Sequence, residues 1–493
     1  MRATLWFAPL LAVPVLAGWM VTGRADGTDA AFGGLTLDDA WIHLVYARSL
    51  AETGVPSYNP PVPEAGFTSP LWMLLLAVGL KLFGTAASTA ALVAKGLSFL
   101  CALGTATLAG VLCRWAGSAR AAPLAIALVA LEPSLASAAV SGMEVHLAAA
   151  LLLGAMAAFA ASRHGLAGAL CGLGLLARPE FLLLAPILVT TRVLLPVPGK
   201  WREAVQLAWP TILAQTMFSG YCLYATGRPL PNTYYVMSGE VHEPLAALSR
   251  LLRDGIGETP YFTLGVGTPL CAWGAWRSLR AAPAAIAAML GFPTLFVIGL
   301  ALTRSFPAVR PFFWHRYLEP VLPLLLVLLA VGAMGAAEAL RRRGTTRLIA
   351  ATASLGLGAL GLIALPPDLL RERVVYSWSA RNVHDLHVAP AEWIAAHAPA
   401  GRPIAVEPAG AIRFFAKNEV IDLFGLNTHE MIGGGGDAYL TRKNPAWFVI
   451  YPEMRGPYQP RFRLYGLRSF STPRYAITGR PPPELWIYRA ESR

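Results

Sequence analysis

Two adjacent carboxylates stand in a short polar stretch of an otherwise apolar chain. They are Asp38 and Asp39, within residues 37–43. Neighbouring negative charges repel each other, which favours a raised pKa on one carboxyl group, a bound cation or a nearby arginine. A carboxylate with a raised pKa suits general-base chemistry on a hydroxyl group. The alternative is structural, because Asp38 also stands where a helix from residue 39 to about 53 would need an N-cap.

Three cationic side chains are candidates for binding a phosphodiester. Arg178 and Arg316 lie where apolar segments end, and the arginine fork meets phosphate oxygens in pairs. Lys95 lies within an apolar segment, and a charge inside a membrane indicates a functional residue by default. The structural alternatives are a snorkelling lysine and ion-paired surface arginines.

Further polar residues accompany these charges. His43 follows Asp39 by one helical turn and could face the same site, although we favour a solvated histidine at the membrane interface. Glu180 could orient Arg178 or contact a sugar, and Glu144 could do either or cap a helix. The remaining candidates for hydrogen bonding or stacking against a sugar are Asn232, Tyr234, Tyr235 and His315.

The composition requires a lipid bilayer as solvent. Of 493 residues, 55% are hydrophobic and only 14% are charged, whereas a soluble domain carries about 25% charged residues. The net charge of +12 is spread over short loops rather than one patch, which argues against nucleic acid as a partner. All five cysteines lie in apolar segments, where packing is their expected role.

The apolar segments predict a polytopic α-helical membrane protein with about eleven transmembrane helices, since one span needs roughly 20 apolar residues. With a cytoplasmic N-terminus, the cytoplasmic loops are rich in arginine and poor in acids, as the positive-inside rule requires. Segment 69–84 would invert this order if it were a span, so we expect it at the interface. The predicted spans are residues 5–22, 86–112, 121–140, 145–162, 165–177, 181–196, 203–225, 260–276, 283–302, 317–338 and 346–365.

This threading places every unusual polar segment on the extracytoplasmic side. We expect a transmembrane domain over residues 1–365, with a first outer loop at 23–85, and a C-terminal extracytoplasmic α/β domain over 366–493. Glycines 433–436 predict a flexible loop and only a weak phosphate-binding motif. In the tail, a helix is predicted at 390–397 and strands at 403–407, 419–424, 446–451 and 485–488.

The motifs taken together resemble bacterial members of the GT-C glycosyltransferase superfamily. They are most similar to the branch of the mycobacterial terminal arabinofuranosyltransferases, and more distantly resemble the protein O-mannosyltransferases and the lipid A aminoarabinose transferase. The resemblance covers almost the whole chain, and its specificity comes from the order of the motifs. After the acidic pair these are Tyr-Ala-Arg at 46–48, Tyr-Asn-Pro at 58–60, Gly-Phe-Thr-Ser-Pro-Leu-Trp at 66–72, Ser-Gly-Met-Glu at 141–144, Ala-Arg-Pro-Glu at 177–180, Pro-Leu-Pro-Asn-Thr-Tyr-Tyr at 229–235, Trp-His-Arg-Tyr-Leu-Glu-Pro at 314–320 and Gly-Ala-Ile at 410–412.

The resemblance implies an inverting glycosyltransferase of the bacterial inner membrane. Such an enzyme moves a sugar from a polyprenyl-phosphate donor to a cell-envelope glycan, lipid or protein. By resemblance, Asp38 is the base, and Asp39 supports it or helps to hold a divalent cation such as Mg²⁺, Mn²⁺ or Ca²⁺. Two other classes stay open: a flippase for lipid-linked sugars, and a non-catalytic polysaccharide-assembly protein. The sequence shows no clear inverted repeat of the kind common in transporters.

Overall fold

The computed structural model describes residues 8–194, 199–237, 243–257, 259–263, 265, 267–304, 316–342, 347–477 and 483–493. The chain divides into two compact units. Unit 1 comprises Met1–Met20, Ser98–Gln215 and His242–Arg373. Unit 2 comprises Val21–Leu97, Thr216–Val241 and Val374–Arg493. Unit 2 therefore joins the first polar loop to the C-terminal tail, although these segments lie at opposite ends of the sequence.

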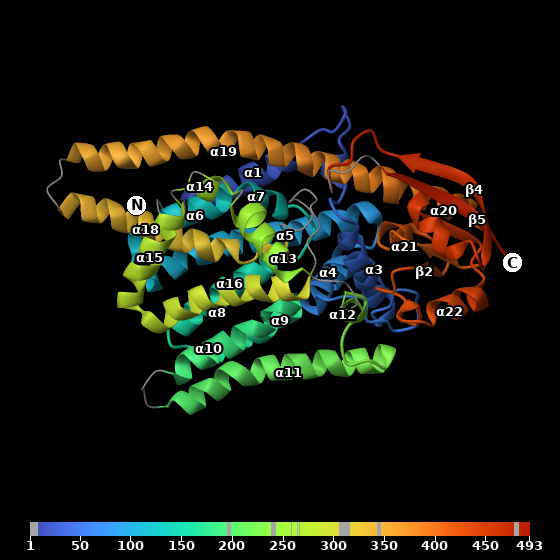
Figure 1. The fold of residues 1–493 in the computed structure, drawn as a ribbon, viewed down its shortest axis with the longest axis horizontal. Helices are drawn as coiled ribbons and strands as arrows, with labels where there is room; N and C mark the ends of the chain where they lie inside the picture. The colour runs from blue at the N-terminus through green and yellow to red at the C-terminus, as the bar shows by residue number, and fades with distance from the viewer. Residues whose placement is uncertain are drawn as a thin grey trace. The chain divides into compact units, whose positions relative to one another are not determined.

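Unit 1 is built from helices, of which α8 packs on α9 and α15 packs on α18 (Figure 1). Helices α5, α11 and α19 each continue into unit 2. The helices are α1 (Ala12–Val21), α5 (Ala87–Trp115), α6 (Ala122–Leu131), α7 (Pro133–Ala138), α8 (Val145–Ala160), α9 (His164–Ala177), α10 (Leu184–Val193), α11 (Lys200–Thr226), α13 (Pro244–Arg250), α14 (Pro260–Thr263), α15 (Gly267–Ala281), α16 (Pro283–Thr303), α18 (Leu322–Arg342) and α19 (Arg347–Val383), with short helical turns at Ala8–Leu11, Ala119–Ala121, Pro179–Leu183 and Leu251–Ile256.

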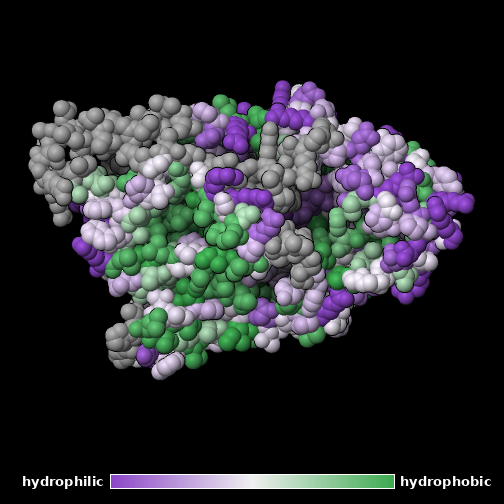
Figure 2. Space-filling model, viewed as in Figure 1, coloured by the Kyte–Doolittle hydropathy of each residue, from purple (hydrophilic) through white to green (hydrophobic). Residues whose placement is uncertain are grey.

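Three of the described helices are long and apolar enough to cross a membrane. They are α5, α16 and the segment Leu322–Ala339 of α18. Figure 2 shows hydrophobic residues gathered over α9, α10 and α16. An outward-facing apolar surface of this kind suits lipid rather than water. The exposed apolar side chains of α9, of α16 and of the turn Pro179–Leu183 include Leu166, Leu173, Leu182, Leu183, Leu295, Ile298 and Leu302.

The predicted span at 121–140 is not one helix. Helix α6 ends at Leu131, and α7 begins at Pro133. Glu132 between them is extended, with φ −64° and ψ 121°, because proline disfavours the helical conformation in the residue before it. The total of eleven spans stays a prediction.

The first loop of unit 2 contributes helices α2 (Ala30–Gly33), α3 (Asp38–Thr53) and α4 (Pro70–Phe83), and residues after α11 form α12 (Asn232–Met237). Helix α3 ends at Gly54, whose φ of 78° is left-handed, as is usual after a helix C-terminus. Helix α4 begins with proline, which suits a first helical turn. Its 14 residues are fewer than a span requires, in keeping with the interfacial placement expected for segment 69–84.

The tail forms an α/β fold around a five-stranded sheet in the order β2-β1-β3-β5-β4. Strands β1, β2 and β3 are parallel, whereas β5 is antiparallel to β3 and β4. Ala405, Ile421 and Phe448 are fully buried in its core. The sheet comprises β1 (Ile404–Val406), β2 (Val420–Asp422), β3 (Trp447–Ile450), β4 (Phe462–Ser471) and β5 (Glu484–Ser492), with helices α20 (Ala389–His397), α21 (Ala411–Phe415) and α22 (Gly436–Lys443).

The strand predictions at the positions of β1, β2, β3 and β5 are confirmed, as is the helix at 390–397. Strand β4 was missed because most of its side chains are exposed, so the buried pattern that marks a strand is almost absent. The predicted glycine loop runs into α22, which begins at Gly436. The boundary at residue 366 stays a prediction, although α19 continues through Pro366 and Pro367.

Removing the central aromatic side chain of the sheet tests this core. Phe448 is fully buried on β3, so Phe448→Ala should cost about 3–5 kcal/mol of unfolding free energy through lost burial and a cavity. Thermal unfolding of the full chain in detergent measures the change. Leu467→Ala on β4, where the side chain is 44% exposed, is the control and should leave the melting temperature nearly unchanged.

Candidate functional site

Asp38 is bound to the start of another helix in unit 2. Its carboxylate accepts the backbone N–H of Gly410 at 2.7 Å and that of Ala411 at 2.9 Å. These groups open α21 and have no partner within that helix. Nδ1 of His387 lies 3.1 Å from the same carboxylate. A Cβ atom on Gly410 would collide with the backbone and side chain of Asp38, so only glycine permits this approach.

The Asp38 contacts fix the charge of its carboxylate. Burial raises its pKa, but the charge and hydrogen bond of His387 and the N–H groups of Ala411 and Gly410 outweigh burial and lower the pKa below its ordinary value. The expected raised pKa is therefore wrong for Asp38. The capping alternative is wrong too, because α3 begins at Asp38 and its N-cap is Leu37, with no side-chain cap.

Asp39 and His43 lie on the same helix, α3. Asp39 is half-buried, whereas His43 is only 6% exposed. The solvated histidine favoured from the sequence is therefore wrong. The reason is tertiary: α3 is covered by α21, where the Trp41 ring packs 4.9 Å from Phe414 and 5.4 Å from Phe415.

Residues of the first-loop motifs bind the tail. The Tyr58 hydroxyl donates to the Ala409 carbonyl at 2.7 Å. Asn59 exchanges two hydrogen bonds with the backbone of Val420 on β2, at 2.8 and 3.0 Å. In this structure, the Tyr-Asn-Pro motif acts by attaching the first loop to the sheet.

A second polar cluster forms around Glu64, a residue outside the motifs of the first loop. One Glu64 oxygen accepts N–H groups of Ala65 at 3.0 Å and Asn232 at 2.9 Å. The other lies 2.9 Å from Nδ1 of His429. The hydrogen bond to Glu64 raises the pKa of His429, against the lowering effect of burial.

The Glu64 cluster is also the group of described residues that could hold a metal ion. One ligand atom each from Glu64, His429 and Glu430 lie within 4.8 Å of one another. Carboxylates and an imidazole suit Zn²⁺ as ligands. Asp39, where the sequence predicted a cation, is not part of this group. Little in the sequence marks this site, because Glu64 stands alone and the pair His429-Glu430 follows more than 300 residues later.

Asn232, Tyr234 and Tyr235 have unlike environments in unit 2. Asn232 is fully buried and also donates to the Leu426 carbonyl at 3.2 Å, so it connects α12 to the loops around Glu64. Tyr234 is 55% exposed, and its ring meets that of Tyr235 edge-on at 5.4 Å. Tyr234 keeps an exposed ring surface for stacking, whereas the Asn232 amide nitrogen is already hydrogen-bonded to Glu64 and Leu426.

Lys95 has three oxygen partners within unit 2. Its ammonium donates to the carbonyls of Ala31 at 2.6 Å and Phe32 at 3.0 Å, and to the Tyr376 hydroxyl at 3.1 Å. A lysine ammonium has three N–H donors, so all of them are used. This arrangement favours a structural role for Lys95 over phosphate binding.

Unit 1 brings together residues from three of its motifs. Nε of Arg178 lies 3.4 Å from Glu144 and 3.9 Å from Glu180. Its Nη1 donates to the backbone carbonyl of Arg316 at 2.6 Å. Arg304 pairs with the other oxygen of Glu180 at 3.3 Å. Glu144, Arg178, Glu180 and the Arg316 backbone therefore meet within unit 1.

The Tyr317 ring completes this arginine–glutamate cluster. The guanidinium groups of Arg304, Arg316 and Arg178 lie 4.7, 5.2 and 5.7 Å from its centroid, within cation–π range. The carboxylates hold Arg178 and Arg304 in place. His315, the neighbour of Arg316, lies outside the described residues.

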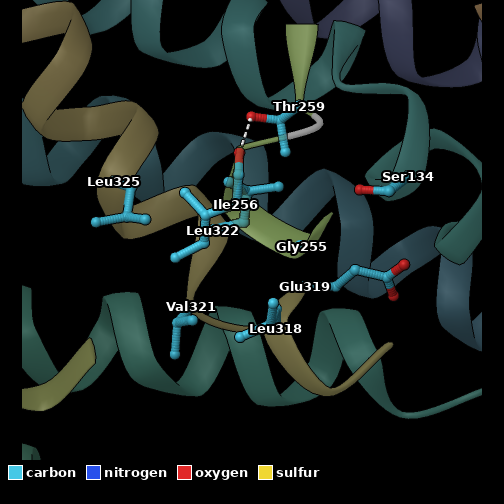
Figure 3. Close-up of a pocket in the computed structure, with 9 residues that line it drawn as sticks. All are labelled: Ser134, Gly255, Ile256, Thr259, Leu318, Glu319, Val321, Leu322 and Leu325. Carbon is cyan, nitrogen blue, oxygen red and sulfur yellow. Dashed lines mark hydrogen bonds between the residues drawn. The ribbon is translucent and has the colours of Figure 1, made fainter. Parts of the chain in front are cut away.

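A pocket near these residues is too small for a sugar. Figure 3 shows Leu318, Leu322 and Leu325 around it, with Ser134 and Glu319 as polar residues on one side. Its volume is about 20 Å³, which is room for about one water molecule. Glu319 therefore borders a small buried space and not a substrate site.

Comparisons with known proteins place the fold. Residues 377–488 match the family model "Domain of unknown function (DUF8728)". No curated protein sequence matches the chain. Among solved structures, ArnT from Cupriavidus metallidurans is similar at a TM-score of 0.60 and 17% identity, over 99% of this chain and 98% of that one.

Two structures of an Archaeoglobus fulgidus oligosaccharyltransferase are also similar. The apo form has a TM-score of 0.61 at 12% identity, over 92% of this chain and 70% of that one. The form named AglB, in complex with an inhibitory peptide and a dolichol-phosphate, has a TM-score of 0.58 at 12% identity, over 92% and 71%. These likenesses support the GT-C fold predicted from the motifs, while the arabinofuranosyltransferase branch stays a prediction.

The pair of Glu64 and His429 should make stability depend on pH. A raised pKa means that the stabilisation is fully present below about pH 6.5, the ordinary pKa of histidine, and is lost as pH rises through the folded value. In metal-free buffer, the melting temperature of the full chain should therefore fall over that range. His429→Gln donates at every pH and should show a smaller fall.

Glu407 titrates over a similar pH range to His429. Comparing the wild type with His429→Gln separates the effects of the two groups. Burial raises the pKa of Glu407 to about 7, so its effect also lowers stability as pH rises, but equally in both proteins. Identical pH profiles for the wild type and His429→Gln would contradict the assignment to His429.

Proposed function

We propose that this protein is a membrane glycosyltransferase of the GT-C type. It moves a sugar from a polyprenyl-phosphate donor to a glycan, lipid or protein acceptor of the cell envelope. The observation that carries the proposal is the fixed, ionised carboxylate of Asp38, beside Asp39 at the start of α3. The fold of an oligosaccharyltransferase that was solved with a dolichol-phosphate supports the class of donor.

Asp38 is the proposed base. Its lowered pKa keeps it ionised at any physiological pH. Oδ2, which accepts only the Gly410 N–H, keeps a further lone pair for the acceptor hydroxyl, whereas Oδ1 already has Ala411 and His387 as partners. A lowered pKa also makes it a weak base. That suits a reaction with a phosphate leaving group and an oxocarbenium-like transition state, in which the hydroxyl proton is lost late. Asp39 is its proposed partner in orienting the acceptor.

The arginine–glutamate cluster is the proposed site of the donor phosphate. Arg316 and Arg304 stack on Tyr317, and guanidinium groups stabilise the developing charge of a phosphate leaving group. Arg178 is the proposed positioning residue, since Glu144, Glu180 and the Arg316 carbonyl hold it. One displacement opposite the phosphate implies inversion at the anomeric carbon.

A divalent cation is the proposed cofactor, and Glu64, His429 and Glu430 fit it as ligands. A structure of the Archaeoglobus fulgidus oligosaccharyltransferase, similar to this chain at a TM-score of 0.56 and 12% identity over 91% of it and 68% of that chain, was solved with Zn and sulfate. A bound cation would add positive charge beside the first loop. We further propose that the protein resides in the bacterial inner membrane, with unit 2 facing outward.

Substitution of the acidic pair tests the enzyme. Asp38→Asn should lower the rate of sugar transfer by about 10²–10⁴-fold, the usual contribution of a general base. Transfer from a synthetic polyprenyl-phosphate sugar to envelope extract, followed by mass spectrometry, measures it. Glu392→Gln, at an exposed position on α20, is the matched control and should retain full activity.

Each outcome of that assay separates the classes. Loss in Asp38→Asn, with an unchanged melting temperature, supports Asp38 as the base. Loss of sugar transfer in Asp39→Asn but not in Asp38→Asn would identify Asp39 as the base. Sugar that crosses a vesicle membrane without forming a new glycosidic bond would show a transporter and overturn the proposal.

Metal binding is tested separately from activity. Wild-type protein stripped with chelator and dialysed against zinc should retain about one zinc ion per chain by elemental analysis. His429→Gln removes an imidazole ligand and should retain at least tenfold less zinc at the same free concentration. Equal retention by the two proteins would remove the metal from the proposal.

A further inference from the structure

A basic pocket in unit 2 lies apart from the acidic pair, with contributions from α3 and α21. Its volume is about 270 Å³, just below the ~300–1,000 Å³ typical of sites for drug-sized ligands. Arg48, Arg413 and Lys417 line it, and Glu52 is its one acidic residue. Three cations and one carboxylate leave two uncompensated positive charges.

Both arginines are held in position. The Arg48 guanidinium lies 4.0 Å above the Phe414 ring, which is close cation–π contact. Arg413 donates from Nε to the Tyr58 carbonyl at 2.6 Å and from Nη1 to the Ala416 carbonyl at 3.1 Å. The side chains are therefore oriented before any ligand arrives, which lowers the entropy cost of binding.

The positive charge has no close carboxylate partner within the described part of the chain, where Glu52 acts on Arg48 and Glu419 acts on Arg413 only from a greater distance. There, no carboxylate lies within 4.0 Å of the guanidinium of Arg48 or Arg413, and Arg48 donates no hydrogen bond to a described residue. Burial and the charge of Arg413 lower the pKa of Arg48, with Glu52 opposing them. Arg48 and Arg413 line the same pocket and repel each other. A bound oxyanion would relieve that repulsion, because it can accept hydrogen bonds from both guanidinium groups.

We propose that this pocket binds a phosphate monoester through Arg48 and Arg413. The guanidinium fork pairs with phosphate oxygens, and a monoester carries about −1.5 to −2 charges at neutral pH, which matches the two uncompensated positive charges. The ester reaches the pocket either as a soluble sugar-type phosphate or as the headgroup of an anionic lipid. The site does not depend on the proposed transferase activity.

The site also has a defined relation to the acidic pair. Asp38 and Arg48 are ten residues apart on one helix, which is about 15 Å at 1.5 Å per residue. The Phe414 ring of α21 packs on Trp41 and lies under Arg48, so α21 covers α3 between the two positions and the pocket is a separate site from the acidic pair.

Binding of two probes to the full chain tests the site. Glycerol 3-phosphate is titrated by calorimetry into protein in detergent, and nanodiscs with phosphatidic acid are compared with nanodiscs of phosphatidylcholine alone. Binding of the soluble probe identifies a free phosphate ester as ligand, and binding only in phosphatidic acid identifies a lipid headgroup. Either result should be weakened at least tenfold by Arg48→Gln.

Two further variants keep the test decisive. Lys417→Gln, at an exposed position, should weaken binding less than Arg48→Gln without affecting folding. Arg489→Gln on β5 removes an exposed arginine that pairs with Glu491 at 3.1 Å and should bind like the wild type. Absence of binding for both probes, or equal binding by Arg48→Gln and Arg489→Gln, overturns the proposal.

Discussion

The attachment of Asp38 to the first backbone N–H groups of α21 is the constraint around which unit 2 is organised. A buried carboxylate is costly unless it is paired and hydrogen-bonded, and here His387, Gly410 and Ala411 supply both. The same contact serves the helix, because α21 begins with N–H groups that need acceptors. Removing either partner would leave the other buried without compensation.

Around this contact, the first loop and the tail form one structure. Tyr46 shows how tightly they fit: its hydroxyl accepts the Gly66 N–H and donates to Asn427, both at 3.1 Å. A Cβ atom on Gly66 would collide with Tyr46, Leu426 and Asn427. The chemistry proposed for the first loop therefore depends on the C-terminal tail, which folds with it in unit 2. A fragment that lacks the tail would leave Asp38 and Tyr46 without these partners.

Unit 1 solves a different electrostatic problem. In this largely apolar bundle, the charges of Arg178 and Arg304 are compensated by Glu144 and Glu180. Replacing such a pair by apolar residues is often neutral for stability, so stability alone does not explain the cluster. Its stacking on Tyr317 keeps several guanidinium groups in one place, as a phosphate site requires.

The sequence by itself determined the apolar helices, most strands of the tail, the polar residues with chemical potential and the GT-C-like fold, because hydropathy and residue order are local signals. Tertiary structure alone decided how those residues are used. The pKa of Asp38 is lowered by His387 and α21, which lie more than 300 residues further along the chain. Lys95, a phosphate candidate by its position, is instead held by Ala31, Phe32 and Tyr376. Charge state and hydrogen bonding depend on which residues become neighbours on folding, and the order of residues in the sequence does not identify those neighbours.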